Sequence, residues 1–140
     1  MPRRFFLDAN VLFTAAISER GASRAIIDLA QAGRCTVFSS AFAFDEAERN
    51  IRSKRPAGLA AIVSFSRIVE TVPEADVAMV AWAATHVPAK DAPILAAAVA
   101  ARVDVLVTGD RRHFGSYFGR LLQTVTVMPP REALEALLAA

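Results

Sequence analysis

Four acidic residues occupy positions from which their carboxylates could do chemistry together: Asp8, Glu46, Asp91 and Asp110. Asp8 follows the apolar run of residues 5–7, which is typical of a buried strand. Glu46 lies one to two turns into the helix predicted after the second strand, and Asp91 begins the helix that precedes the fourth strand. Asp110 follows that fourth strand. Because sites in an α/β sheet form at the carboxyl ends of strands, we expect these acids to converge on one edge.

Carboxylates gathered in this way repel one another and raise one another's pKa, which is usually tolerated only when a cation lies among them. Oxygen ligands alone suit Mg²⁺ or Mn²⁺ rather than zinc, which prefers histidine or cysteine. His86 and His113 are too few and too poorly spaced for a zinc site. A magnesium-type site with one or two ions can position water and stabilise a phosphoryl leaving oxygen. The pattern therefore predicts hydrolysis of a phosphodiester.

Each acid also has a purely structural interpretation. Asp8 and Asp91 can each cap the helix that follows, and Asp110 can be a turn residue. For any one acid taken alone the structural interpretation is the better one. Independent caps have no reason to share one edge of a sheet, so the four acids together favour a metal site. Asp104 precedes the fourth strand, at the opposite edge, and is interpreted as structural.

The elements that must position these acids alternate between strand and helix. Strands are predicted at residues 4–7, 35–39, 67–72, 103–108 and 123–128. Helices are predicted at residues 10–17, 22–32, 40–52 with Ser40 as the cap, 59–65, 74–85, 91–102 and 131–140. This alternation predicts an α/β fold, a three-layer sandwich around a central, mostly parallel five-stranded sheet. Residues 1–140 are expected to form a single domain.

Composition and charge exclude several classes of protein. The formal net charge of +2 is too small to indicate a polyanionic partner by itself. The single cysteine, Cys35, excludes an intrachain disulfide and is expected to be a small core residue. Asp8 and Asn10 interrupt the apolar N-terminal stretch, which argues against a signal peptide, and no run is long enough to span a membrane. We expect a soluble cytoplasmic protein with no membrane partner.

Four segments of the chain resemble the PIN domain family, the fold of many bacterial toxin ribonucleases. They are LDANVL at 7–12, DEAERNI at 45–51, KDAPILAAAV at 90–99 and LVTGDRRHF at 106–114, so the resemblance spans most of the chain. It places the catalytic and metal-binding acids at Asp8, Glu46, Asp91 and Asp110. It also implies that Asn10 and Thr108 hydrogen-bond either a water on the metal or a ligand carboxylate.

The acid on the helix after the second strand has three candidates. Asp45, Glu46 and Glu48 lie close together, but successive helical positions point about 100° apart, so only one can face a site squarely. Glu46 is chosen because its distance from the second strand and the residues that follow it look most like the family pattern.

The resemblance implies a metal-dependent endoribonuclease that cuts single-stranded RNA with Mg²⁺ or Mn²⁺. Such proteins are often the toxin of a toxin–antitoxin pair and often dimeric, so a cognate antitoxin and a homodimer are expected partners besides RNA. Cleavage is expected to leave a 5′-phosphate. The segment RRHFGSYFGR at 111–120 departs from a minimal family member because it is longer and more aromatic.

Basic and aromatic residues flank the acids. Arg49 and Arg52 continue the Glu46 helix, and Arg111 and Arg112 follow Asp110. These arginines are either ordinary solvated surface or contacts to RNA phosphates, and both interpretations stay open. The aromatic residues of this segment could stack on bases, but apolar packing is the more common role. They are Phe114, Tyr117 and Phe118.

Two other functions remain as alternatives. A haloacid-dehalogenase-type phosphatase would use Asp8 as a covalent nucleophile, but it needs an aspartate where this chain has Asn10. A non-catalytic module of the same fold would bind RNA or protein without cutting, although all four acids are present. Nucleophilic serine catalysis has little support, because no GxSxG motif occurs and neither histidine has an obvious partner acid.

Overall fold

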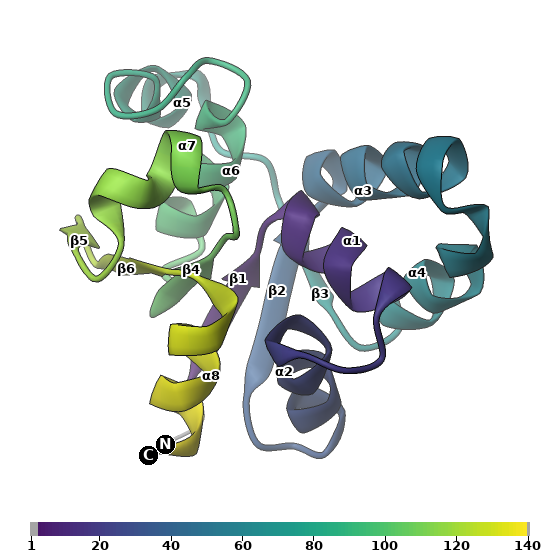
Figure 1. The fold of residues 1–140 in the computed structure, drawn as a ribbon. Helices are drawn as coiled ribbons and strands as arrows, with labels where there is room; N and C mark the ends of the chain where they lie inside the picture. The colour runs from purple at the N-terminus through teal and green to yellow at the C-terminus, as the bar shows by residue number, and fades with distance from the viewer. Residues whose placement is uncertain (1–2, 140) are drawn as a thin grey trace.

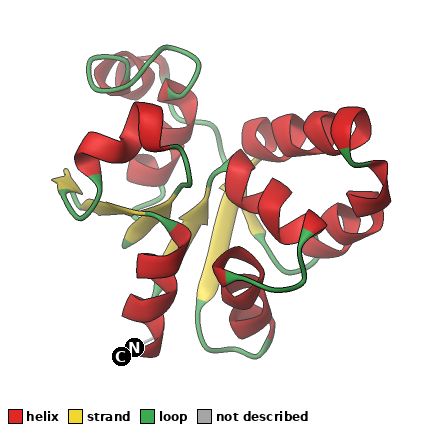
Figure 2. Ribbon diagram, viewed as in Figure 1, coloured by secondary structure: helices red, strands yellow, loops and turns green. Residues whose placement is uncertain are grey.

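The structure is a computed structural model that describes residues 3–139. These residues form a six-stranded sheet flanked by helices, with strand order β3-β2-β1-β4-β6-β5 (Figures 1 and 2). The strands are β1 (Arg4–Leu7), β2 (Thr36–Ser40), β3 (Glu70–Val72), β4 (Val105–Val107), β5 (Leu121–Leu122) and β6 (Val125–Met128). All neighbouring pairs are parallel except β5 and β6. The predicted α/β fold with a mostly parallel sheet is confirmed.

Helices cover the sheet on both sides. They are α1 (Ala9–Ile17), α2 (Ala22–Gln31), α3 (Ala41–Lys54), α4 (Leu59–Phe65), α5 (Val77–Ala83), α6 (Ala92–Ala100), α7 (Arg111–Phe114) and α8 (Pro130–Leu138). Figure 1 shows α1 to α4 grouped on one side of the strands and α5 to α7 on the other. The terminal helix α8 packs against α2. No helix within residues 3–139 is long and apolar enough to cross a membrane.

The strand order reverses between β1 and β4. From β1 the chain proceeds to β2 and then β3 in one direction, crosses back, and continues from β4 to β6 in the other. Right-handed crossovers running in opposite directions place their helices on opposite faces of the sheet. The loops after β1 and β4 therefore diverge and leave a crevice at their carboxyl ends, which is where ligands bind in open α/β sheets.

The apolar side chains of β1 suit its position at the centre of the sheet, where both faces of the strand are covered. Phe5, Phe6 and Leu7 are fully buried, and such a continuous apolar run is typical of a parallel strand covered on both faces. Leu7 pairs with Val107 of β4. Because the next residues in the two strands are then level, Asp8 and Thr108 emerge side by side at the same edge.

The sheet has six strands rather than the predicted five. The added strand, β5, is two residues long and pairs antiparallel with β6 through a turn in which Gln123 takes a φ of 56°. A strand of two residues is too short to produce an alternating pattern in the sequence. The other five strands are observed where the sequence predicts them; β1 has the predicted bounds and the other four have shifted ends.

Several predicted elements are shorter in the structure, and two of the differences have clear local causes. The strand predicted at 67–72 begins only at Glu70, because residues 66–69 form a turn after α4. The helix predicted at 74–85 begins at Val77, because the Asp76 side chain accepts a hydrogen bond from the Met79 N–H at 2.9 Å and so caps the helix there. The helix predicted at 131–140 begins at Pro130, and its predicted last residue, Ala140, lies outside the described residues.

Candidate functional site

Asp8 is the buried centre of the site. It follows β1 directly, and only 5% of its surface is exposed. One carboxylate oxygen, Oδ1, accepts a hydrogen bond from the Ala9 N–H at 2.6 Å, and Asp8 is the N-cap residue of α1. The other oxygen, Oδ2, accepts hydrogen bonds from the Thr108 hydroxyl at 2.9 Å and the Asn10 amide at 3.1 Å. The capping interpretation therefore holds for a side chain that also lines the cavity at this edge of the sheet.

Asn10 joins the loops after β1 and β4. Its Nδ2 donates to Asp8, while its Oδ1 accepts a hydrogen bond from the Gly109 N–H at 2.7 Å. The Thr108 hydroxyl oxygen also accepts a hydrogen bond from the Asp110 N–H at 3.1 Å. A side chain at Gly109 would crowd this network, because a Cβ would lie 3.3 Å from the Asn10 Oδ1. The network fixes Asp8 and Asp110 relative to each other.

The ionised form of Asp8 is disfavoured in the folded protein. The pKa of Asp8 is raised to about 6, chiefly by burial and in smaller part by the charges of Glu46 and Asp91. The hydrogen bonds from Thr108 and Ala9 oppose this rise but do not cancel it. A bound cation would remove the repulsion and return Asp8 to its charged form.

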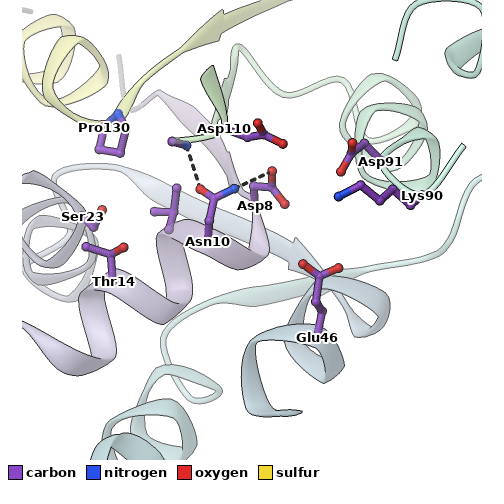
Figure 3. Close-up of a pocket in the computed structure, with 11 residues that line it drawn as sticks. Asp8, Asn10, Thr14, Ser23, Glu46, Lys90, Asp91, Asp110 and Pro130 are labelled. Atoms are coloured by element: carbon purple, nitrogen blue, oxygen red, sulfur yellow. Dashed lines mark hydrogen bonds between the residues drawn. The ribbon is translucent and has the colours of Figure 1, made fainter. Parts of the chain in front are cut away.

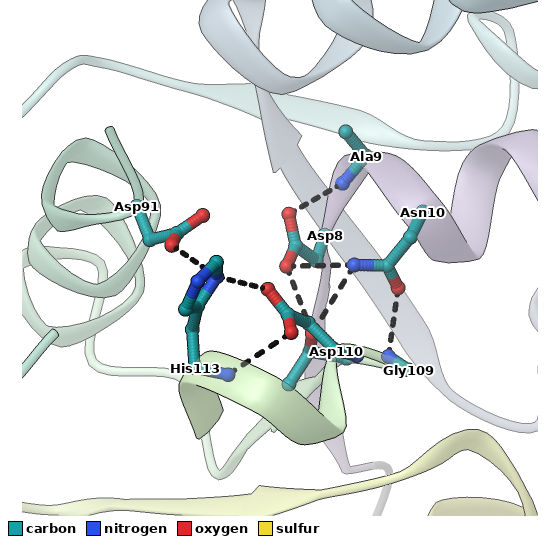
Figure 4. Close-up of polar contacts among 8 residues, drawn as sticks. Asp8, Ala9, Asn10, Asp91, Gly109, Asp110 and His113 are labelled. Carbon is teal, nitrogen blue, oxygen red and sulfur yellow. Dashed lines mark hydrogen bonds and ion pairs between the residues drawn. The ribbon is translucent and has the colours of Figure 1, made fainter. Parts of the chain in front are cut away.

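Asp91 and Asp110 lie on the other side of the crevice, with His113 between them (Figure 4). The His113 Nδ1 is 2.8 Å from the Asp110 Oδ2 and 3.0 Å from the Asp91 Oδ2. The Asp110 Oδ1 accepts a hydrogen bond from the His113 backbone N–H at 3.0 Å, so Asp110 also caps the short helix α7. Asp91 is the N-cap residue of α6, yet its side chain makes no capping hydrogen bond. Its carboxylate is turned toward the site instead.

The two carboxylates beside His113 respond differently to their surroundings. Burial raises the pKa of Asp91, and the charge of Asp110 adds to this effect while Lys90 and His113 oppose it. Burial alone would also raise the pKa of Asp110, but hydrogen bonds from the His113 backbone and ring outweigh it and lower that pKa. Asp110 is therefore the acid of the pair that ionises more readily.

Glu46 completes the acidic wall of the crevice. A cavity of about 440 Å³ is lined by all four predicted acids together with Asn10 and Lys90. Figure 3 shows the Glu46 carboxylate rising from α3 toward Asp8 and Lys90. Asp45 is exposed and does not line the cavity. Glu48 instead forms an ion pair with Arg52 one turn further along α3, at 3.1 Å.

The structure thus brings together all the acids that the sequence singles out. It also places Asn10 and Thr108 against Asp8, as expected of neighbouring residues. Asp104 lies at the opposite edge, where its Oδ2 accepts a hydrogen bond from the Arg4 N–H at 2.9 Å. Its structural interpretation therefore fits, as does that of Cys35, which is buried.

Two site residues were missed by the sequence analysis. The expectation that neither histidine has a partner acid is wrong, because His113 has two. The missing signal was local: Asp110 and His113 are three residues apart, and they meet only because a turn of helix, α7, begins directly after Asp110. Lys90 was overlooked although it precedes Asp91, and its ammonium group points into the crevice (Figure 3).

The flanking basic and aromatic residues fall into two groups. Arg49, Arg52, Arg111 and Arg112 are exposed, as either interpretation of them requires. Phe114 is fully buried and therefore packs in the core rather than on RNA bases. Tyr117 is half-buried and its hydroxyl donates to the His86 carbonyl oxygen at 3.2 Å. Trp82 lies against the His86 ring, 4.9 Å between ring centres.

The donors present fit a hard divalent cation. Within residues 3–139, the Asp91 Oδ2 is a buried side-chain oxygen without a hydrogen-bond partner. Such an atom is unfavourable unless a cation or water satisfies it. Carboxylate oxygens at an open crevice are the ligands that Mg²⁺ and Mn²⁺ prefer. The four acids could hold such an ion between them.

Comparison with known proteins agrees with the geometry. The PIN domain family model matches residues 4–112. Among solved structures, the chain is similar to that of VapBC2 from Rickettsia felis, which is bound to a DNA fragment from the VapBC2 promoter. The TM-score is 0.68 at 14% identity, over 90% of this chain and 98% of that one. No curated protein matches the chain.

Two further structures share the fold. PAE2754 from Pyrobaculum aerophilum has a TM-score of 0.66 at 17% identity, over 100% of both chains. FitAB bound to an IR36 DNA fragment has a TM-score of 0.51 at 21% identity, over 90% of this chain and 94% of that one. The family model covers residues from β1 to the start of α7, including all four acids. The chain belongs to the PIN domain family.

Proposed function

We propose that this protein is a metal-dependent endoribonuclease that hydrolyses phosphodiesters of single-stranded RNA. The observation that carries the proposal is the burial of Asp8 among three further acids, Glu46, Asp91 and Asp110, around one crevice. Burial, helped by the neighbouring like charges, raises the pKa of the Asp8 carboxyl; this arrangement is unfavourable without a bound cation but suits a cation site.

The proposed cofactor is Mg²⁺ or Mn²⁺, held by these four acids. When bound, such an ion supplies positive charge that polarises the phosphate and favours deprotonation of an attacking water. The chain supplies the positioning. Asp8 is fixed by hydrogen bonds to both of its oxygens, and Asp110 is fixed by the backbone and ring of His113. Ligands whose orientation is already set need little rearrangement on binding.

Positive side chains around the acids are proposed to bind the RNA backbone. Arg111 and Arg112 follow Asp110 on the exposed side of α7, and Arg49 and Arg52 extend from the same helix as Glu46. A polyanion approaching an acidic crevice needs such cations to offset repulsion. Lys90, which points into the crevice, is closer to the reacting phosphate in this scheme.

The biological role is proposed from the family. We propose that the protein is the toxin of a toxin–antitoxin pair, neutralised by a cognate antitoxin, and that it acts as a cytoplasmic homodimer. This is supported by the resemblance of its four motifs to toxin ribonucleases and by the fold it shares with VapBC2 and FitAB.

The test is cleavage of a mixed single-stranded RNA pool by the wild type and by Asp8→Asn, with Mg²⁺, Mn²⁺ or EDTA. We expect cutting only with a metal ion, products with 5′-phosphate ends, and loss of at least 100-fold in rate in the variant, as about 3 kcal/mol of lost transition-state stabilisation would give. Thermal unfolding checks that the variant is folded. If wild type and variant both bind RNA and neither cuts it, the non-catalytic alternative is correct.

A further inference from the structure

The ring of His113 occupies the position between two of the proposed ligand carboxylates. Helix α7 begins immediately after Asp110, and a spacing of three residues brings the His113 side chain back over that carboxylate. The Asp91 carboxylate reaches the same ring from the start of α6 (Figure 4). Two carboxylates, one at the start of α6 and one at the start of α7, therefore lie beside the same ring nitrogen of His113.

A single N–H of the ring does not satisfy both carboxylates. The His113 Nδ1 is 2.8 Å from one carboxylate oxygen of Asp110 and 3.0 Å from one of Asp91. An imidazole nitrogen carries at most one proton, so it can donate to only one of the two acids. The hydrogen bond goes to Asp110, and the Asp91 Oδ2 is left buried and without a partner.

A metal ion would satisfy all three atoms at once. Adjacent ligands of an octahedral ion lie about 3 Å apart when each is about 2.1 Å from the metal. The two nitrogen-to-oxygen distances have this spacing. One ligand atom each from Asp91, Asp110 and His113 all lie within 4.8 Å of one another. With its proton on Nε2, the ring presents a lone pair on Nδ1 to this space.

We propose that Nδ1 of His113 is a direct ligand of the divalent ion that Asp91 and Asp110 bind. The donor set is then mixed nitrogen and oxygen, and it favours a first-row transition ion such as Mn²⁺ over Mg²⁺, which prefers oxygen. This inference rests on the proposed metal site. It replaces the oxygen-only site that the sequence suggests with a site that selects Mn²⁺ over Mg²⁺.

The test uses pulsed electron paramagnetic resonance of Mn²⁺ bound to the protein after removal of any purification tag. A directly bound imidazole gives a characteristic ¹⁴N modulation of the Mn²⁺ signal. The chain has two histidines, so His113→Gln and the control His86→Gln divide the possible sources. His86 packs against Trp82 and Tyr117 and does not line the acidic cavity. The His113 backbone N–H that caps Asp110 is kept in His113→Gln, and thermal unfolding confirms the fold of both variants.

The wild type and His86→Gln should show the imidazole modulation, and His113→Gln should lack it. Mn²⁺ affinity should fall in His113→Gln by about tenfold or more, and Mg²⁺ affinity by much less. If Mn²⁺ binds to the wild type without imidazole modulation, His113 only orients Asp110 and the inference is wrong, while the proposed nuclease site stands. If Mn²⁺ fails to bind, or binds equally to Asp8→Asn, both proposals fail.

Discussion

The surroundings of the Asp8 carboxylate both stabilise and destabilise its ionised form. Thr108, Asn10 and the Ala9 N–H hydrogen-bond its two oxygens, yet burial and two nearby acids raise its pKa to about 6. A group whose folded-state pKa is raised stabilises the fold while protonated. That stability is complete below the unfolded-state pKa of about 4 and is lost as the pH rises through about 6.

We therefore expect the stability difference between Asp8→Asn and the wild type to depend on pH. Asparagine cannot ionise, so the variant escapes the penalty that the wild type acquires as the pH rises from about 4 through 6. Without metal, the free energy of unfolding of the variant relative to the wild type should increase by roughly 2 kcal/mol between pH 4 and pH 8. Urea unfolding at pH 4 and pH 8 measures it. A difference that is the same at both pH values would show that residue 8 carries no raised pKa.

Some residues of the site could be predicted from the sequence and others could not. Asp8, Asp91 and Asp110 could be placed because each adjoins a strand or helix end that the apolar pattern marks. His113 could not, because its partners are Asp110 through a four-residue helix and Asp91 through the tertiary fold. Neither relation leaves a periodic signal in the sequence.

At the scale of elements, α3 decides which of three acids enters the site. Glu46 lines the cavity, Asp45 is exposed, and Glu48 pairs with Arg52 along the helix surface. The sequence alone placed the three close together and could not fix the rotation of the helix. Packing of Ala43, Ala47 and Ile51 against the core does fix it, because these buried residues define one face of α3.

Glu46→Gln should weaken Mn²⁺ binding by about tenfold, since it removes one negative charge from the cavity. Asp45→Asn removes the same charge from the same helix at a position that faces solvent, so its Mn²⁺ affinity should stay within about twofold of the wild type, as expected for screened surface charge. Titration calorimetry with Mn²⁺ compares the two. Equal losses in both variants would mean that the ion responds to net charge and that Glu46 is no ligand.

Strands and helices also differed in how well the sequence marked them. The central strands are continuous apolar runs between turn residues, and their order along the chain is as predicted. The short edge strand β5 and helix α7 were missed, because two- and four-residue elements depend on pairing with β6 and on the Asp110 cap rather than on periodicity. The start of α5 depends on the Asp76 cap, which lies within the helix predicted at residues 74–85.

At the scale of the whole molecule, the reversal of strand order between β1 and β4 creates the site. It sets the loops after these strands apart and allows α3 and α6 to bring Glu46 and Asp91 to the same crevice. The convergence was predictable from the alternation of strands and helices, because parallel strands share one carboxyl edge. The depth at which Asp8 is buried and the closeness of His113 to Asp91 and Asp110 could not be predicted from the sequence, since both follow from packing.

The central claim is that these acids hold the ion that enables RNA cleavage, and the rate of cleavage against Mn²⁺ concentration tests it most directly. Asp91→Asn removes a proposed ligand, and Asp104→Asn is the matched control, because Asp104 lies at the opposite edge and its amide oxygen can still accept from the Arg4 N–H. The account predicts that Asp104→Asn follows the wild-type curve, while Asp91→Asn needs at least about tenfold more Mn²⁺. Wild-type cleavage that persists in EDTA, or an Asp91→Asn curve that coincides with the wild type, would contradict it.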